Sequence, residues 1–202
     1  MNISSLHNSQ INQAASILAN AFDNDPVLRY LTPKESQPRV NALRWFFSTS
    51  LEQVSIYRHI YTTSDDFKGV AAWIPPEHST EDHYSLSEAD LAEFNLKLGS
   101  SKAERFKSFF SILDERQKQD APQPHWYLYL LGVSSAYQGQ KIGSSLIQPI
   151  LKQADQNGFY CYLVTTTERG VSFYQKHGFE VAWMGETFAG SPHIWTMTRK
   201  PG

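Results

Sequence analysis

The segment "YQGQKIGSSL", residues 137–146, combines glycines and a lysine in a pattern suited to binding phosphate. It follows the apolar run "LYLLGV" and leads into "LIQPIL", so a strand is expected to enter a helix through it. Backbone N–H groups at a helix N-terminus lack intrahelical acceptors, and the helix dipole favours negative charge there. Gly139 and Gly143 would let a ligand approach the backbone, and Lys141 adds a positive charge. The segment therefore predicts a diphosphate site or, in the simpler interpretation, only a tight strand-to-helix turn.

Motifs of other enzyme classes are missing from the sequence. The run "GQKIGSS" has neither the P-loop spacing nor the three-glycine dinucleotide fingerprint. The loop could also bind the phosphates of a nucleotide in another class of enzyme, although the sequence shows no carboxylate pattern for a catalytic metal. The densest histidine cluster, "HSTEDH", lacks zinc-ligand spacing, and no G-x-S-x-G elbow occurs. We therefore expect no bound metal.

Composition narrows the partners and the compartment. With 18 basic and 20 acidic residues well mixed along the chain, no basic surface for nucleic acid or an anionic membrane is expected. The single cysteine, Cys161, lies in the apolar run "FYCYLV", so it is expected to pack in the core and cannot form an intrachain disulfide. No targeting segment or membrane-spanning run is found, which favours a cytoplasmic protein. Oligomeric state cannot be inferred.

The elements that must position the loop form a mixed α/β pattern, expected as one domain over residues 1–202. A "DNDP" segment is expected to stop the first helix, and Pro149 is expected to kink the helix after the loop. The expected order is helices near 11–22 and 37–53, a hairpin of 55–63 and 68–75, a helical insertion at 77–120, strand 125–133, helix 141–157, strand 159–166, helix 168–177, and a hairpin of 179–187 and 193–199.

Two motifs resemble one family. The segment "YQGQKIGSSL" resembles the acetyl-CoA loop of the GNAT acetyltransferase superfamily, Q/R-x-x-G-x-G/A, with Gln138 first, Gly143 last and Lys141 in place of the middle glycine. Downstream, "ERGVSFYQKHGFE" is similar to that superfamily's closing helix-to-strand segment. The segments "AFDNDPVLRYLTP" and "HWYLYLLGV" resemble the branch of puromycin acetyltransferase and small-molecule N-acetyltransferases. The resemblance implies a single GNAT-like domain with a splayed central sheet flanked by helices.

The resemblance also assigns roles, with a coenzyme-binding core at about residues 125–182. The backbone at Leu131 and Val133 would pair with the pantetheine arm of acetyl-CoA, and Thr167 stands where many relatives have an asparagine that binds this arm. Tyr174 would protonate the leaving thiolate, because a tyrosine keeps its proton at neutral pH. The loop residues expected to hold the pyrophosphate are Gln138, Gly139, Gln140, Lys141, Ile142, Gly143 and Ser144.

The implied reaction is direct transfer of an acetyl group from acetyl-CoA, as co-substrate, to a primary amine in a ternary complex. Relatives often place a carboxylate base near the start of the strand that here reads "HWYLYLL", where this chain offers His125 or Tyr127, either of which could simply pack. A small-molecule amine is favoured because no long single-sign groove is indicated. An acyl-CoA-binding regulatory domain without useful turnover is the alternative. The aromatic residues Trp45, Phe46, Phe47 and Trp126 could line an acceptor pocket or belong to the core.

Overall fold

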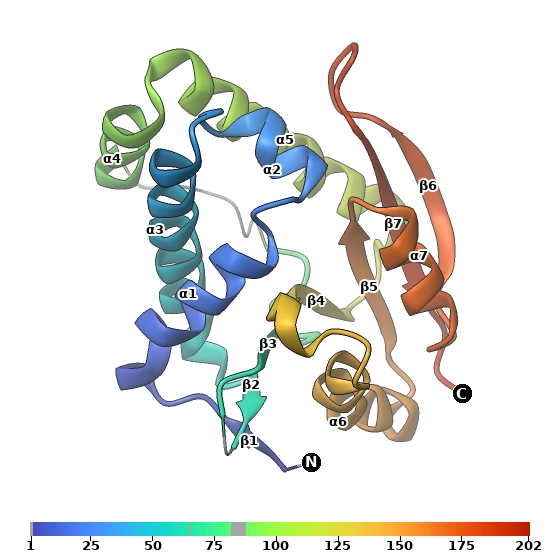
Figure 1. Cartoon of the computed structure of the whole chain (residues 1–202). Helices are drawn as coiled ribbons and strands as arrows, with labels where there is room; N and C mark the ends of the chain where they lie inside the picture. The colour runs from blue at the N-terminus through green and yellow to red at the C-terminus, as the bar shows by residue number, and fades with distance from the viewer. Residues whose placement is uncertain (1, 65, 82–87) are drawn as a thin grey trace.

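The computed structural model describes residues 2–64, 66–81 and 88–202. A seven-stranded mixed sheet runs through them in the order β1-β2-β3-β4-β5-β7-β6, flanked by helices (Figure 1). The helices are α1 (Ile11–Ala21), α2 (Pro26–Leu31), α3 (Ser36–Val54), α4 (Glu88–Leu98), α5 (Ser100–Asp120), α6 (Ile142–Asn157) and α7 (Glu168–Gln175). The strands are β1 (Ile3–Ser5), β2 (Ile60–Thr63), β3 (Gly69–Ile74), β4 (His125–Val133), β5 (Tyr160–Thr165), β6 (Glu180–Glu186) and β7 (His193–Arg199).

The expected mixed α/β fold is confirmed, and most expected elements fall within a few residues of their predicted limits. The insertion consists of α4 and α5, apart from residues 82–87, which lie outside the described part of the chain. Five short elements were not predicted: β1, α2, and the 3-10 turns Asn8–Gln10, Ser135–Tyr137 and Ser55–Tyr57. That turn shortens the first hairpin strand, because Arg58 adopts a left-handed conformation (φ 60°) and redirects the chain into β2.

One neighbouring pair of described strands is parallel. Every neighbouring pair is antiparallel except β4 and β5, whose parallel connection requires the crossover helix α6. Helix α6 is assigned as one α-helix from Ile142 to Asn157, with Pro149 inside it. Pairing between β4 and β5 runs from His125 opposite Tyr160 to Leu128 opposite Leu163 and stops there. Beyond that point β4 pairs with β3 alone.

A β-bulge in β4 marks the point where the two strands part. Opposite Trp73 stands Leu128, whereas opposite the preceding Ala72 stands Leu130, so Tyr129 is an extra residue in β4. The side-chain alternation breaks there as well. Trp126 and Leu128 pack on the α6 side of the sheet, but Tyr129 and Leu130 both pack on the other. The side chain of Leu131 again packs on the α6 side, so the normal alternation resumes after the bulge.

Two hydrophobic clusters cover the two faces of the sheet. One contains buried side chains of α1, α2, α3 and α5, and the other contains those of α6 together with Tyr174 of α7. Strand β3 serves both, because Val70, Ala72 and Ile74 face the first cluster while Ala71 and Trp73 face the second. Helix α1 approaches β4 closely at Gly132, where an added Cβ would lie 2.6 Å from Leu18 Cδ2. The C-terminal end of α1 therefore packs against β4 near the point where β4 and β5 separate.

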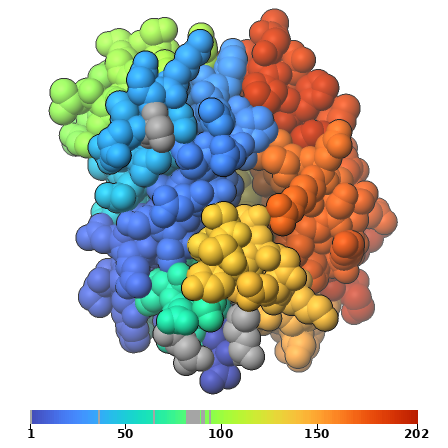
Figure 2. Space-filling model, in the orientation of Figure 1, coloured from blue at the N-terminus to red at the C-terminus, as the bar shows by residue number. Residues whose placement is uncertain are grey.

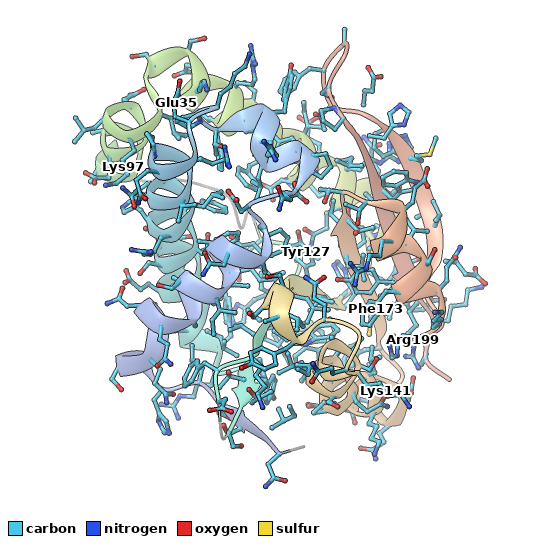
Figure 3. The ribbon with its side chains drawn as sticks, in the orientation of Figure 1. Glu35, Lys97, Tyr127, Lys141, Phe173 and Arg199 are labelled. Carbon is cyan, nitrogen blue, oxygen red and sulfur yellow. The ribbon has the colours of Figure 1, made fainter. Side chains whose placement is uncertain are left out.

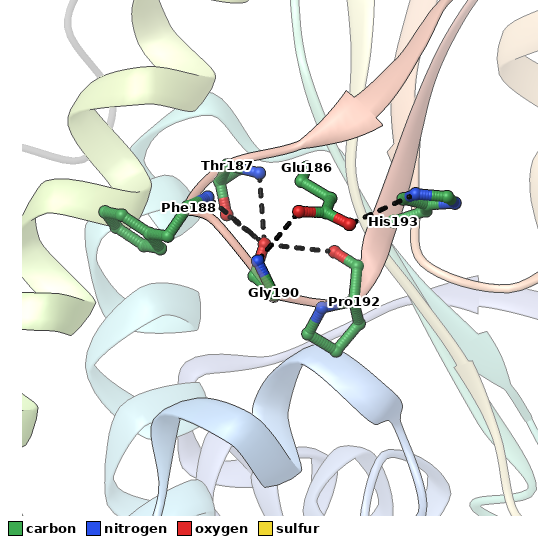
Figure 4. Close-up of polar contacts among 7 residues, drawn as sticks. Glu186, Thr187, Phe188, Gly190, Pro192 and His193 are labelled. Atoms are coloured by element: carbon green, nitrogen blue, oxygen red, sulfur yellow. Dashed lines mark hydrogen bonds and ion pairs between the residues drawn. The ribbon is translucent and has the colours of Figure 1, made fainter.

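The turn between β6 and β7 is closed by side chains (Figure 4). The Ser191 hydroxyl accepts N–H groups of Thr187 and Phe188 at 3.1 Å, and the Glu186 carboxylate accepts the N–H of Gly190 at 2.8 Å. Phe188 packs against the cluster that contains the aromatic residues of α5. The expected C-terminal hairpin is therefore present, and its turn is tied to the helical insertion.

Arg199 links three elements beside the second cluster. Its guanidinium donates to both carboxylate oxygens of Asp155 in α6, at 2.6 and 2.9 Å, and to the backbone carbonyl of His177 at 3.0 Å. The same contact holds the pKa of Asp155 below its usual range. Because His177 follows α7, one side chain of β7 fixes both helices that flank the parting strands.

Candidate active site

A cleft of about 1360 Å³ opens where β4 and β5 part. Its walls come from the segment 20–28, from α3 and α5, from β4, and from the loop before α6 and helix α7. In Figure 1 the blue N-terminal helices and the orange α7 lie on opposite sides of the yellow loop. The space-filling view shows these three segments meeting around a recess (Figure 2). Chain segments distant in sequence thus enclose one site.

The floor of the cleft contains backbone without a strand partner on one edge. From Leu130 to Val133, β4 pairs with β3 on one side and with no described strand on the other, and the bulged Tyr129 has no register partner in either strand. Leu131 and Val133, the two residues expected to pair with a pantetheine arm, lie in this stretch and line the cleft. The Val133 carbonyl accepts a hydrogen bond from Gln138 Nε2 at 3.1 Å. The remaining exposed edge resembles a slot for an added strand.

The loop before α6 lies at one end of the cleft. Gln138, Gly139, Lys141, Ile142, Gly143 and Ser144 line it, whereas Gln140 is exposed and is not among the lining residues described. Lys141 precedes α6 with φ 63°, and Gly139 has φ 79°. Lysine therefore adopts the left-handed conformation that glycine adopts more readily. The loop keeps a glycine-type turn and carries a cation at its tip.

The loop and α7 contact each other directly. Ser144 Oγ lies 2.9 Å from His177 Nε2, and a Cβ added at Gly143 would lie 3.2 Å from the Phe173 ring. Figure 3 labels Lys141 and Phe173 on these adjoining elements. Burial and the nearby Arg199 lower the pKa of His177, so its imidazole is neutral at neutral pH. Thr167 lines the cleft, and its hydroxyl accepts the N–H of Gly170, which caps α7.

Tyr174 lies in the wall of the cleft and is buried, with 8% of its surface exposed. Its ring packs edge-on against Phe173 and Phe179, with centroids 5.0 and 5.8 Å away. Burial raises the pKa of Tyr174 above its ordinary value. The phenol therefore keeps its proton across the physiological range and is able to donate it.

Asp25 is a buried carboxylate that faces the same cleft and was missed from the sequence. One of its oxygens accepts the N–H groups of Val27 and Leu28 at 3.0 and 2.9 Å, and the other accepts the Thr166 hydroxyl. These three bonds leave about one of the four acceptor positions of a carboxylate. Burial raises the pKa of Asp25. The sequence does carry a signal for it, since aspartate before proline is a typical start of a helix, here α2.

The two candidates near the start of β4 lie in different surroundings. His125 is fully buried and is not among the lining residues; its Nδ1 lies 2.7 Å from the Gln123 carbonyl and its Nε2 lies 3.1 Å from Gln117 Nε2. These contacts give it a structural role. Tyr127 does line the cleft. Of the four aromatic residues considered for an acceptor pocket, Phe46 and Phe47 line the cleft, and Trp45 and Trp126 are not among its lining residues.

Charge is divided between the two ends of the cleft. The cations among the lining residues, Lys141, Arg169 and Lys176, belong to the loop and α7. The carboxylates, Asp23 and Asp25, belong to the segment between α1 and α2. Within the described residues, no group of three or more metal-ligating side chains occurs, and no helix has the length and apolar character needed to cross a bilayer. The cleft thus offers one cationic end and one carboxylate end.

The sequence of this chain is similar to those of known acetyltransferases. A family model described as "Acetyltransferase (GNAT) family" matches residues 105–179, which include most of α5 and all of β4, the loop, α6, β5 and α7. An uncharacterised N-acetyltransferase of Schizosaccharomyces pombe is 29% identical over 171 residues, covering 83% of this chain and 69% of that protein. Residues 105–179 therefore match the GNAT acetyltransferase family. The family match and the N-acetyltransferase relative support an acyltransferase, and GNAT acetyltransferases use acetyl-CoA as co-substrate.

Solved structures share the GNAT fold along the whole chain. A histone acetyltransferase HPA2-related protein from Corynebacterium glutamicum has a TM-score of 0.69 at 21% identity, covering 100% of this chain and 96% of that one. Arylalkylamine N-acetyltransferase 2 from Aedes aegypti has a TM-score of 0.63 at 14% identity, with coverages of 100% and 99%. A polyamine N-acetyltransferase from Drosophila melanogaster, which forms N-acetylagmatine, has a TM-score of 0.63 at 13% identity, with coverages of 98% and 99%.

The left-handed conformation of Lys141 gives a prediction about the free protein. Lys141→Gly is expected to raise the free energy of unfolding by about 0.5 to 1 kcal/mol, because glycine adopts this conformation without the steric cost of a Cβ, a gain partly offset by its unfolded-state entropy. Urea unfolding of the unliganded protein measures it. Lys141→Ala is the control, since it removes the same charge and keeps the Cβ. An equal gain in both variants would contradict the conformational explanation.

Proposed function

We propose that residues 1–202 form one domain that transfers an acetyl group from acetyl-CoA to the primary amine of a small molecule. The observation that carries this proposal is the gap between β4 and β5 with the loop at its end. The unpaired backbone of Tyr129 to Val133 fits a pantetheine arm, which can pair with it as an added strand would. The loop from Gln138 to Ser144 fits a diphosphate, with Lys141 and the start of α6 supplying positive potential.

The cleft residues have roles in the transfer. Bound acetyl-CoA supplies a thioester as acyl donor. The Asp25 carboxylate accepts a proton from the attacking amine at its remaining acceptor position, and its raised pKa brings it closer to the operating pH. Tyr174 donates its phenolic proton to the departing sulfur. Thr166 and the two α2 amides hold Asp25 in place, and α7 holds Tyr174. Holding the amine against the acyl donor supplies much of the acceleration.

The acceptor is a small amine. The cleft is enclosed by α2, α3 and α5 opposite the loop, and its charges are few and confined to its two ends. A protein tail would require a longer groove of one sign. Structural neighbours named for arylalkylamines and for agmatine formation agree with an amine acceptor.

Binding of acetyl-CoA is the first test of this function. Separate isothermal titrations with acetyl-CoA, ATP and NAD are expected to show binding of acetyl-CoA alone. Lys141→Glu reverses the charge where we place the pyrophosphate, so the Kd should rise at least about tenfold. Lys152→Glu is the matched control, because Lys152 is exposed on the same helix and does not line the cleft. A wild-type protein that ignores millimolar acetyl-CoA would refute the proposal.

The role of Asp25 predicts a pH dependence. A base acts only when ionised, so kcat/KM should rise with pH through the raised pKa of Asp25, and Asp25→Asn should lower kcat/KM about 100-fold and remove this limb. Asp23→Asn removes the other carboxylate of the cleft and should keep the limb. An unchanged pH profile in Asp25→Asn would exclude the role.

Stability provides a second readout for Asp25. The folded-state pKa lies above the unfolded one, so protonated Asp25 is compatible with burial at low pH, and this contribution to stability is lost as pH rises through the folded pKa. Asparagine keeps an oxygen for the two α2 amides. The variant should therefore gain stability relative to wild type as the pH rises towards neutrality, which thermal unfolding at several pH values measures.

Tyr174→Phe removes only the phenolic oxygen from a packed ring. We expect kcat to fall about 100-fold while the Kd of acetyl-CoA changes less than about twofold, because the proton is donated only as the sulfur departs. Single-turnover kinetics with a saturating amine measure the chemical step. Equal losses of binding and turnover would instead indicate that the hydroxyl serves to hold the coenzyme.

A further inference from the structure

The carboxylate end of the cleft is enclosed by aromatic rings. Phe46 and Phe47 come from α3, Phe109 and Phe110 from α5, and Tyr127 and Tyr129 from β4, and all six line the cleft. Each is 9% exposed or less, so the rings form the inner wall of the cleft and not its rim. In Figure 3 the labelled Tyr127 lies at the centre of the molecule, between the N-terminal helices and α7.

The rings hold one another in place. Phe46 stacks on Phe110 with centroids 5.5 Å apart, and Phe109 meets Phe110 edge-on at 5.3 Å. Tyr127 and Tyr129 meet edge-on at 5.8 Å. Such contacts fix the rings before a ligand arrives, so the wall is preformed and offers apolar faces and edges.

The carboxylate end of the cleft has few carboxylates that could pair with a cationic group of the acceptor. Asp23 is already neutralised, since Arg39 donates to the same Asp23 oxygen through Nε and a terminal nitrogen, both at 2.8 Å. Asp25 is then the one carboxylate among the described lining residues that is left for a substrate amine. A second ammonium or a guanidinium on the acceptor would lie among aromatic rings without a carboxylate partner, which is costly in a desolvated site.

We propose that the acceptor is a monoamine with an aromatic or bulky apolar body, and that diamines, polyamines and guanidino amines are poor acceptors. The amino group meets Asp25, and the body lies against the rings of α3, α5 and β4. This inference rests on the proposed function and narrows its substrate class. The aromatic wall selects for the body of the acceptor, and the single available carboxylate selects for one positive charge.

The test compares acceptors that differ in charge and body. With saturating acetyl-CoA, kcat/KM for 2-phenylethylamine is expected to exceed that for 1,4-diaminobutane and agmatine at least about tenfold, with hexylamine between them. Binding of the same amines to the CoA-loaded protein, measured by isothermal titration, should follow the same order and does not depend on turnover.

A pair of variants on α5 tests the wall itself. Phe110→Leu should raise the KM for 2-phenylethylamine at least about fivefold and leave the Kd of acetyl-CoA unchanged. Phe106→Leu is the matched control, because Phe106 is also buried on the same helix and contacts Phe46, at 5.1 Å between ring centroids, but is not among the lining residues. It should lower stability and leave the KM unchanged.

The outcomes separate the two proposals. If acetyl-CoA binds and a diamine or agmatine is the better acceptor, the inference is wrong and the transferase function stands. The inference is equally wrong if acetyl-CoA binds and no aromatic amine binds or reacts, or if both leucine variants raise the KM alike. Failure of acetyl-CoA itself to bind would refute the proposed function and this inference with it.

Discussion

The end of pairing between β4 and β5 is the constraint on which the site depends. A parallel pair in the middle of a sheet would normally continue along both strands, leaving no backbone group unpaired. Here the ladder stops at Leu128 and Leu163, and the extra residue Tyr129 redirects β4 towards β3. The gap can persist because each strand is held on its other side, β4 by β3 and β5 by β7. Unpaired strand backbone is normally found on the edge strands of a sheet, but here it occurs on the central strand β4.

The two helices beside this gap are held by contacts outside it. Arg199 joins Asp155 in α6 to the backbone after α7, and Ser144 meets His177 across the loop. On the opposite side, Gly132 lets α1 approach β4, and the helix cap at Asp25 fixes α2 against Thr166 at the end of β5. One wall of the cleft is therefore anchored to β7, and the other is anchored to β4 and to the end of β5, which keeps loop, phenol and carboxylate in one site.

The sequence predicted the half of the site that depends on local pattern. The glycine loop, the strand before it and the helix after it could be recognised because turn chemistry and apolar periodicity act over a few residues. Lys141 keeps the turn that its neighbours require, as the left-handed φ shows. Tyr174 was placed in the cleft through its motif, since a tyrosine beside a phenylalanine would otherwise be expected in the core.

The other half depends on contacts between distant segments and was predicted only in part, through Phe46, Phe47 and Tyr127. The "DNDP" segment was interpreted as a helix stop, although it also starts α2 and brings Asp25 to the end of β5. His125 was considered as a base, but Gln117 and the Gln123 carbonyl occupy its ring nitrogens. The bulge at Tyr129 arises from the register with β3, which no local pattern encodes. Phe46 and Phe110 meet only after α3 and α5 have packed together.

The two halves of the cleft are also separate along the chain. Segment 20–28 and the phenylalanines of α3 precede β4, whereas the loop and α7 follow it, and β4 itself borders both. A chimera with its junction in β3 would therefore exchange the segment 20–28 and the phenylalanines of α3, and would retain the whole coenzyme side. The aromatic residues of α5 and β4 would also be retained, and the exchanged helices would have to repack against them. Recombination at this point can therefore change the specificity for the acceptor and leave the residues on the acetyl-CoA side unchanged.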